Sequence, residues 1–82
     1  MIRHRDIQDI ALREKIRHGT VLYGGNRKLN IYGTLDCYSG KRMKRENRVF
    51  FESSDEAKSE GYRPCGHCMK SEYQKWIYSA NR

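Results

Sequence analysis

The chain has 82 residues, the length of one small domain. Seventeen lysines and arginines against ten acidic residues give a formal net charge of +7, which favours a polyanionic partner such as nucleic acid. Hydrophobic residues make up only 37% of the chain, so the core is expected to be thin and to need a metal ion or another cross-link.

The three cysteines are an odd number, which argues against a closed disulfide framework. The sequence shows no signal peptide and no apolar run of membrane-spanning length. We therefore expect a cytoplasmic protein, with no membrane partner, whose thiols stay reduced and available to bind a metal.

The first thirty residues predict a helix followed by a hairpin. Asp6 is expected to cap a helix from Ile7 to about His18, and Gly19 to end it. Residues 20–23 and 28–32 read as two strands, with a turn signal at 24–26 between them.

The second half predicts one more strand and two helices. Residues 47–51 read as a strand that feeds the core, and Ser53-x-x-Glu56 is a capping box that opens a short helix through Lys58. A last helix follows residue 68, with Trp76 expected on its buried face. The whole chain, residues 1–82, is thus predicted to be one α+β domain with a short antiparallel sheet, two or three flanking helices and a zinc cross-link.

The segment that carries the chemistry is Cys65-Gly66-His67-Cys68. Two cysteines at this spacing can hold one metal ion, and the turn between them can direct backbone N–H groups at the sulfurs. Cys37 can add a third thiolate from a distant part of the chain. The pattern predicts a single zinc ion held by Cys37, Cys65 and Cys68.

A basic segment lies beside Cys37 in the sequence. Residues 41–48 carry five basic side chains and one acidic one. Such a cluster suits contacts with phosphate groups, and no recognition-helix pattern indicates base reading. The residues predicted to contact DNA are Lys41, Arg42, Lys44, Arg45 and Arg48.

Three segments resemble the Ada-type metal-binding domain, the module at the N-terminus of the Ada methylated-DNA repair protein. They are Tyr32-x4-Cys37, Glu46-Asn47-Arg48-Val49-x-Phe51, and Glu56-Ala57-x3-Gly61-Tyr62-Arg63-Pro64-Cys65-x-x-Cys68. The resemblance covers residues 31–69, and residues 1–30 form an N-terminal extension of helix and hairpin.

The resemblance implies a role in DNA repair or transcription regulation. In that family four cysteines hold one zinc ion, and the first accepts a methyl group from a methyl phosphotriester in damaged DNA. Cys37 matches that first cysteine, and Cys65 and Cys68 match the last pair. Lys41 stands at the position of the second cysteine, and a lysine with an ordinary pKa near 10.4 is a poor zinc ligand.

The fourth ligand is therefore open at the level of sequence. The candidates are His67, His4, His18, a water molecule or another group, and the position can also be left open. The function is open as well. The protein is at most a one-shot methyl acceptor at Cys37, with no sign of turnover, and the alternative is a purely structural zinc module that mediates contacts with another protein.

Overall fold

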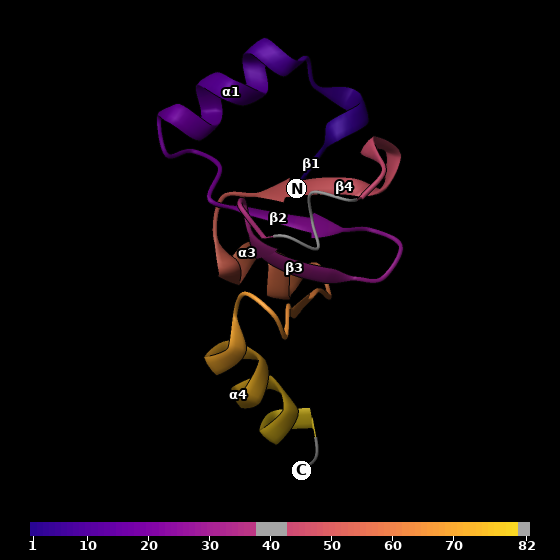
Figure 1. The fold of residues 1–82 in the computed structure, drawn as a ribbon, viewed down its shortest axis with the longest axis vertical. Coiled ribbons are helices and arrows are strands. Elements are labelled where there is room, and N and C mark those ends of the chain that lie inside the picture. The colour runs from indigo at the N-terminus through magenta and orange to yellow at the C-terminus, as the bar shows by residue number, and fades with distance from the viewer. Residues whose placement is uncertain (38–42, 81–82) are drawn as a thin grey trace.

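A five-stranded sheet forms the centre of the domain in the computed structural model, which describes residues 1–37 and 43–80 (Figure 1). The strands are β1 (Ile2–Arg3), β2 (Tyr23–Asn26), β3 (Ile31–Thr34), β4 (Arg48–Phe51) and β5 (Arg63–Pro64). Their order across the sheet is β1-β4-β2-β3-β5. The predicted α+β class is confirmed. The sheet differs from the expected one in a parallel pair, because β5 runs alongside β3 in the same direction.

The helices lie around this sheet and at the two ends of the molecule. They are η1 (His4–Asp6), α1 (Asp9–Arg17), η2 (Arg45–Asn47), α3 (Ser54–Ser59) and α4 (Lys70–Ala80). The domain measures 42 × 24 × 21 Å, with α1 and α4 at opposite ends of its long axis (Figure 1).

The first helix begins later than predicted. Asp6 does not cap it, because residues 4–6 form the separate turn η1, which the Ile7 N–H closes on the His4 carbonyl at 3.4 Å. The residue before α1 is Gln8, whose side chain makes no capping hydrogen bond. Gly19 follows the helix with φ of +73°, as the sequence predicted for its end.

The hairpin is also displaced along the chain. The expected turn at residues 24–26 lies inside β2, and the actual turn follows it. Asn26 closes that turn, since its Oδ1 accepts the N–H groups of Lys28 at 2.9 Å and Leu29 at 3.2 Å. Asn30 then takes a φ of +57°, which asparagine tolerates better than most residues.

One face of the sheet, which we call the core face, carries the main hydrophobic core and is covered by α3. Phe51, Val49 and Tyr32 are fully buried there, and Ala57 of α3 packs against them. The Phe51 ring meets Tyr62 edge-on, with 4.9 Å between the ring centres. Each of these large apolar side chains stabilises the fold by about 1.5–3 kcal/mol through burial.

The opposite face, which we call the open face, carries the second hydrophobic cluster at one end. Phe50 points to this side and packs with Val21 and with Leu12 of α1. Paired residues of a sheet point to the same side, so Gly24 and Gly33, which pair with each other, lie on this face as well. At these two positions the open face therefore has no side chain of its own.

The capping box before α3 forms in part. Ser53 Oγ accepts the Glu56 N–H at 3.1 Å, as the sequence predicted. The Glu56 carboxylate, however, accepts the N–H of Glu52 at 2.8 Å instead of that of Ser53. This backbone hydrogen bond lowers the pKa of Glu56. Gly61 follows the helix with φ of +87°.

The expected burial of Trp76 is wrong, since 40% of this side chain is exposed. The reason is the direction of α4, which projects away from the sheet (Figure 1). Met69, just before the helix, packs against the core cluster, and the periodic apolar side chains farther along have no sheet beneath them.

The two neighbouring glycines of β2 allow a matched test of this packing. A Cβ at Gly25 would lie 3.0 Å from both the Ile31 carbonyl oxygen and the Phe51 ring, so we expect Gly25→Ala to lower the free energy of unfolding by about 1–3 kcal/mol. A Cβ at Gly24 would meet no atom closer than 3.8 Å, so Gly24→Ala should change it by less than about 1 kcal/mol. Chemical denaturation of both variants checks this, and equal stabilities would contradict the packing described.

Candidate metal centre

The pairing of β3 with β5 brings the three cysteines together. The Cys65 N–H donates to the Tyr32 carbonyl at 2.7 Å, which extends the parallel ladder by one residue. Cys37 follows β3 in a turn that its own N–H closes on the Thr34 carbonyl at 3.2 Å. Cys68 lies at the other end of the Cys-x-x-Cys turn, before α4. Segments far apart in the sequence thus meet at one corner of the open face.

The distances between the sulfurs fit a metal site. The Sγ atoms of Cys37 and Cys65 are 3.8 Å apart, and all three sulfurs lie within 4.8 Å of one another. Tetrahedral zinc, with Zn–S bonds of about 2.3 Å, places two sulfurs about 3.8 Å apart. A disulfide would need about 2.05 Å. The three cysteines are therefore arranged to hold a metal and do not form a disulfide.

Backbone N–H groups support two of the sulfurs. The Thr34 N–H points at Cys68 Sγ and the His67 N–H at Cys65 Sγ, each at 3.4 Å. Such donors favour the thiolate form that metal binding requires. The Cys37 and Cys65 side chains are only 8% and 7% exposed, so solvent has little access to them.

Gly33 is required by the close approach of the sulfur cluster to β3. A Cβ at this position would lie 2.6 Å from Cys68 Sγ and 3.2 Å from the Cβ of Cys65. No real Cβ atom stands that near a sulfur, so any other residue would push the Cys-x-x-Cys turn away from the strand.

The three histidines lie outside the cluster of ligand atoms. Among the described residues that cluster consists of the three sulfurs alone. The Nε2 atom of His4 is 3.6 Å from an Asp9 carboxylate oxygen, and the His4 ring packs edge-on against Phe50. His18 follows α1 as its C-cap residue, and the His67 side chain is exposed on the turn.

Comparison with known proteins agrees with this geometry. The family model described as the metal binding domain of Ada matches residues 7–70, well over half of the chain. The chain belongs to the Ada metal-binding domain family. The match begins at Ile7, so it reaches farther toward the N-terminus than the resemblance over residues 31–69.

A relative of this Ada-family domain is the uncharacterized protein MJ0818 of Methanocaldococcus jannaschii. The two are 37% identical over 49 residues, a stretch that covers 60% of this chain and 24% of that protein. The chain thus matches about a quarter of the relative's length. No solved structure matches the chain. In the described part of the chain no helix is long and apolar enough to span a membrane.

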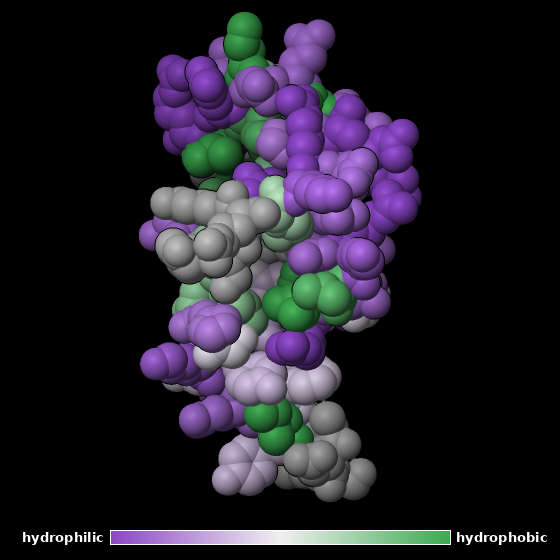
Figure 2. All heavy atoms as spheres, turned by 45° about the vertical axis from the view of Figure 1, so that its right-hand side comes forward, coloured by the Kyte–Doolittle hydropathy of each residue, from purple (hydrophilic) through white to green (hydrophobic). Residues whose placement is uncertain are grey.

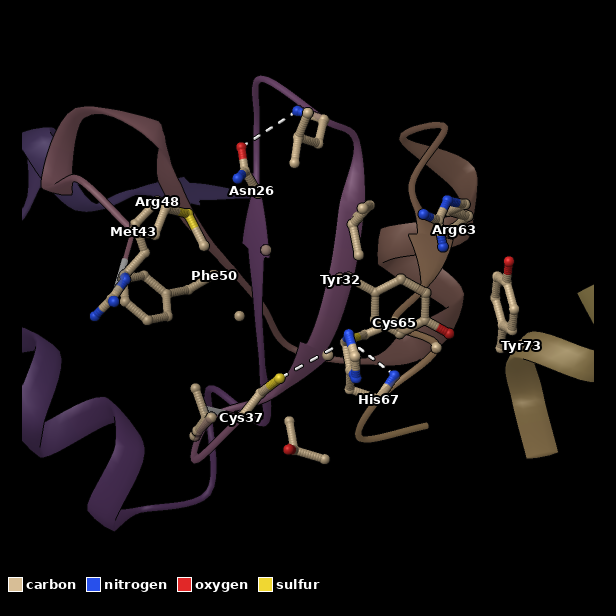
Figure 3. Close-up of a pocket in the computed structure, with 18 residues that line it drawn as sticks. Asn26, Tyr32, Cys37, Met43, Arg48, Phe50, Arg63, Cys65, His67 and Tyr73 are labelled. Carbon is tan, nitrogen blue, oxygen red and sulfur yellow. Dashed lines mark hydrogen bonds between the residues drawn. The ribbon is translucent and has the colours of Figure 1, made fainter. Parts of the chain in front are cut away.

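The Ada-family domain has a pocket of about 520 Å³ beside the sulfur cluster, over the open face. Figure 3 shows Arg48 and Arg63 at opposite sides of this pocket, with Cys37 and Cys65 along one edge. The two arginines belong to one row across the sheet. Arg48 pairs with Asn26, Asn26 with Ile31, and Ile31 with Arg63. We call this space the arginine pocket.

The structure describes three of the five residues predicted to contact DNA. Arg48 lines the arginine pocket. Lys44 and Arg45 are exposed near η2, where an Arg45 nitrogen lies 3.5 Å from the Asp9 carboxylate. Lys41 and Arg42 fall outside the described residues. Hydrophilic side chains nevertheless cover much of the face in Figure 2, with hydrophobic ones in separate patches.

Arg63 is the pocket residue that the sequence analysis missed. It lies inside the Gly-Tyr-Arg-Pro-Cys segment, in which the cysteine is the residue that indicates a metal site. Its position next to Pro64 and in a two-residue strand gave no alternating pattern to place its side chain. Only the pairing with Ile31 puts it on the same side as Arg48.

The glycine beside the sulfurs gives a test of the metal site. We expect Gly33→Ala to lose most of its bound metal, because the new methyl group would displace Cys68 Sγ from the other two sulfurs. Gly24→Ala, at the paired position of the neighbouring strand, is the matched control and should keep its metal. Elemental analysis of both purified variants measures this, and full occupancy in Gly33→Ala would contradict the described geometry.

Metal retention should depend on pH. Burial raises the pKa of the Cys68 thiol from 9.0 to about 11, so without metal this thiol is protonated at neutral pH. A metal ion must displace that proton, and we expect the apparent metal affinity to fall about tenfold per pH unit, for each proton displaced, as the pH decreases. Competition with a chelator at several pH values, corrected for the chelator's own protonation, checks this. A pH-independent affinity would argue against thiolate ligation.

Proposed function

We propose that this domain holds one zinc ion through Cys37, Cys65 and Cys68 and binds the phosphate backbone of DNA at the arginine pocket. One observation carries the proposal. The sulfur of Cys37, which matches the methyl-accepting position of the family, borders the same pocket as Arg48 and Arg63. Membership of the Ada metal-binding family also supports metal binding and a role at DNA.

The charge distribution supports phosphate as the ligand. Arg48 and Arg63 stand three strands apart, which is about 14 Å between their Cα atoms. Between them on the open face lie Asn26 and Ile31, with Gly24 in the next row, so an extended anionic chain can lie across the sheet with a cation at each side. The net charge of +7 adds a longer-range attraction.

The metal has a structural part in this proposal. When bound, zinc would hold the three sulfurs as thiolates. It would also cross-link the turn after β3 to the turn after β5, and such a link can contribute about 10–16 kcal/mol of apparent folding free energy. The cross-link would thereby reinforce the pairing of β5 with β3, which places Arg63 at the pocket.

Methyl acceptance at Cys37 is the finer form of the same function. The Cys37 thiolate would attack the methyl carbon of a methyl phosphotriester, the carbon–oxygen bond would break, and a phosphodiester anion would leave. Arg48 and Arg63 would stabilise the negative charge that develops on that phosphate. Three thiolates carry less charge than the four of the family pattern, so we expect the transfer to be slower than in a four-cysteine relative.

The alternative is a structural zinc module that contacts another protein. The two functions predict different behaviour toward DNA, although the fold and the metal would be the same. A protein-contact module has no need for a cation at each side of one pocket, so the placement of Arg48 and Arg63 favours the DNA-binding function.

Electrophoretic mobility shifts test DNA binding directly. We expect duplex DNA to be retained at low salt and released at high salt. In Arg48→Gln we expect the slope of log affinity against log salt to fall by about 1, because one phosphate contact is removed. Arg13→Gln, which removes an equal charge from the exposed side of α1, is the control. No retention of duplex or single-stranded DNA at low salt would leave the protein-contact alternative.

Methyl transfer is tested by mass spectrometry. After incubation with a short duplex that carries one methyl phosphotriester, we expect the intact mass to rise by one methyl group in place of one hydrogen. Peptide mapping should place it on Cys37 and not on Cys65 or Cys68. An unchanged mass, in protein that still binds the duplex, would remove this role and leave the DNA-binding proposal in place.

A further inference from the structure

Beyond the arginine pocket, on its β5 side, two aromatic rings of α4 lie next to Arg63. Tyr73 and Trp76 are nearly parallel, with 18° between their planes and 6.1 Å between their centres. The guanidinium carbon of Arg63 is 5.2 Å from the centre of the Tyr73 ring and 5.7 Å from that of Trp76. We call these three side chains the aromatic platform.

The platform is continuous with the pocket. Tyr73 is one of the residues that line the arginine pocket, and Figure 3 shows it on the same side as Arg63. The Tyr73 ring packs closely against Gly66 of the Cys-x-x-Cys turn. A Cβ added at Gly66 would lie only 3.3 Å from the ring. The arginine holds a fixed place too, because its Nη1 donates to the Pro64 carbonyl at 3.1 Å.

Burial in the hydrophobic core does not account for the position of Trp76, the more exposed of the two rings. Trp76 leaves 40% of its surface in solvent, and α4 carries it away from the hydrophobic core. Both rings also lie outside residues 7–70, the part of the chain that matches the family model. The platform is therefore a feature that the family assignment does not explain.

We propose that the aromatic platform stacks an unpaired nucleobase of the nucleic acid whose phosphates the arginine pocket binds. This inference rests on the proposed DNA binding. Aromatic rings beside a basic groove are the usual arrangement of proteins that bind single strands, because every base has a face that can stack and every phosphate has a charge. A cation already in place over the rings adds to both contacts.

The platform would give the domain a preference between nucleic acid forms. In a duplex the faces of each base are covered by its neighbours, so stacking on Trp76 requires a base that is unpaired, at a strand end or turned out of the helix. Phosphate contacts alone do not make this distinction. We therefore expect single-stranded DNA, or a duplex with an unpaired nucleotide, to bind more tightly than a fully paired duplex of equal charge.

The chain contains one tryptophan, so Trp76 reports on its own contact. Titration of the metal-loaded protein with an oligothymidine single strand should quench the tryptophan fluorescence, and a paired duplex of the same length should quench it much less. In Trp76→Ala, binding of a labelled single strand, followed by anisotropy, should weaken roughly 5- to 150-fold, with duplex affinity changed less than about twofold. Trp76→Phe should restore part of the loss.

Tyr78→Ala is the matched control, because this residue lies on the same helix, is 77% exposed and is not part of the platform. It should bind both nucleic acids as the unchanged protein does. Circular dichroism and metal content of each variant show that the fold is intact.

Three results would overturn the inference. Duplex binding with no quenching by the single strand, or equal single-strand affinity in Trp76→Ala, would leave the proposed function standing and the platform as a contact for another protein. Absence of binding to either nucleic acid would reject the proposed function and this inference together.

Discussion

The alignment of β5 with β3 is the interaction on which the rest of this domain depends. It consists of few hydrogen bonds, and the Cys65 N–H to Tyr32 carbonyl bond at 2.7 Å is the last of them. Through it the Cys-x-x-Cys turn arrives beside Gly33, close enough that no side chain fits between. The same alignment turns Arg63 toward the open face. A short piece of parallel ladder therefore positions both the sulfurs and one of the two pocket cations.

The open face can form a pocket because two paired positions of its middle strands are glycines without side chains. Gly24 and Gly33 are paired neighbours, so the centre of the sheet presents peptide groups where other sheets present side chains. The row next to it ends in Arg48 at one side and Arg63 at the other. The floor of the pocket and its two charged borders follow from these sequence positions and the pairing, and residues of the adjoining loops complete its lining.

Much of the centre could be predicted from the sequence, because cysteine spacing is a local signal with few structural solutions. The three sulfurs and the α+β class follow from that spacing and from the strand and helix patterns. The glycines of β2 were misread as a turn, since Gly-Gly-Asn usually marks one, whereas here Gly25 is needed under the Phe51 ring. A local sequence pattern contains no information about Phe51, the distant neighbour that leaves no room for a side chain at Gly25.

The exposure of Trp76 and the place of Arg63 in the pocket could not be predicted, for a related reason. A helical repeat of apolar residues shows that a helix has an apolar side, but not how far along its length another surface covers that side. In α4 the cover ends near the first turn. Arg63 could be placed only through its strand partner, and a strand of two residues leaves no periodic trace. Both positions are set by tertiary arrangement and not by propensity.

The two hydrophobic clusters lie on opposite faces of the sheet and differ in their distance from the metal site, although β4 contributes Phe50 to one and Val49 and Phe51 to the other. The cluster of Leu12, Val21 and Phe50 under α1 contains no cysteine, whereas Met69 and Tyr62 join the other cluster close to the sulfurs. Removal of the metal would therefore act first on the carboxyl-terminal third, by local opening.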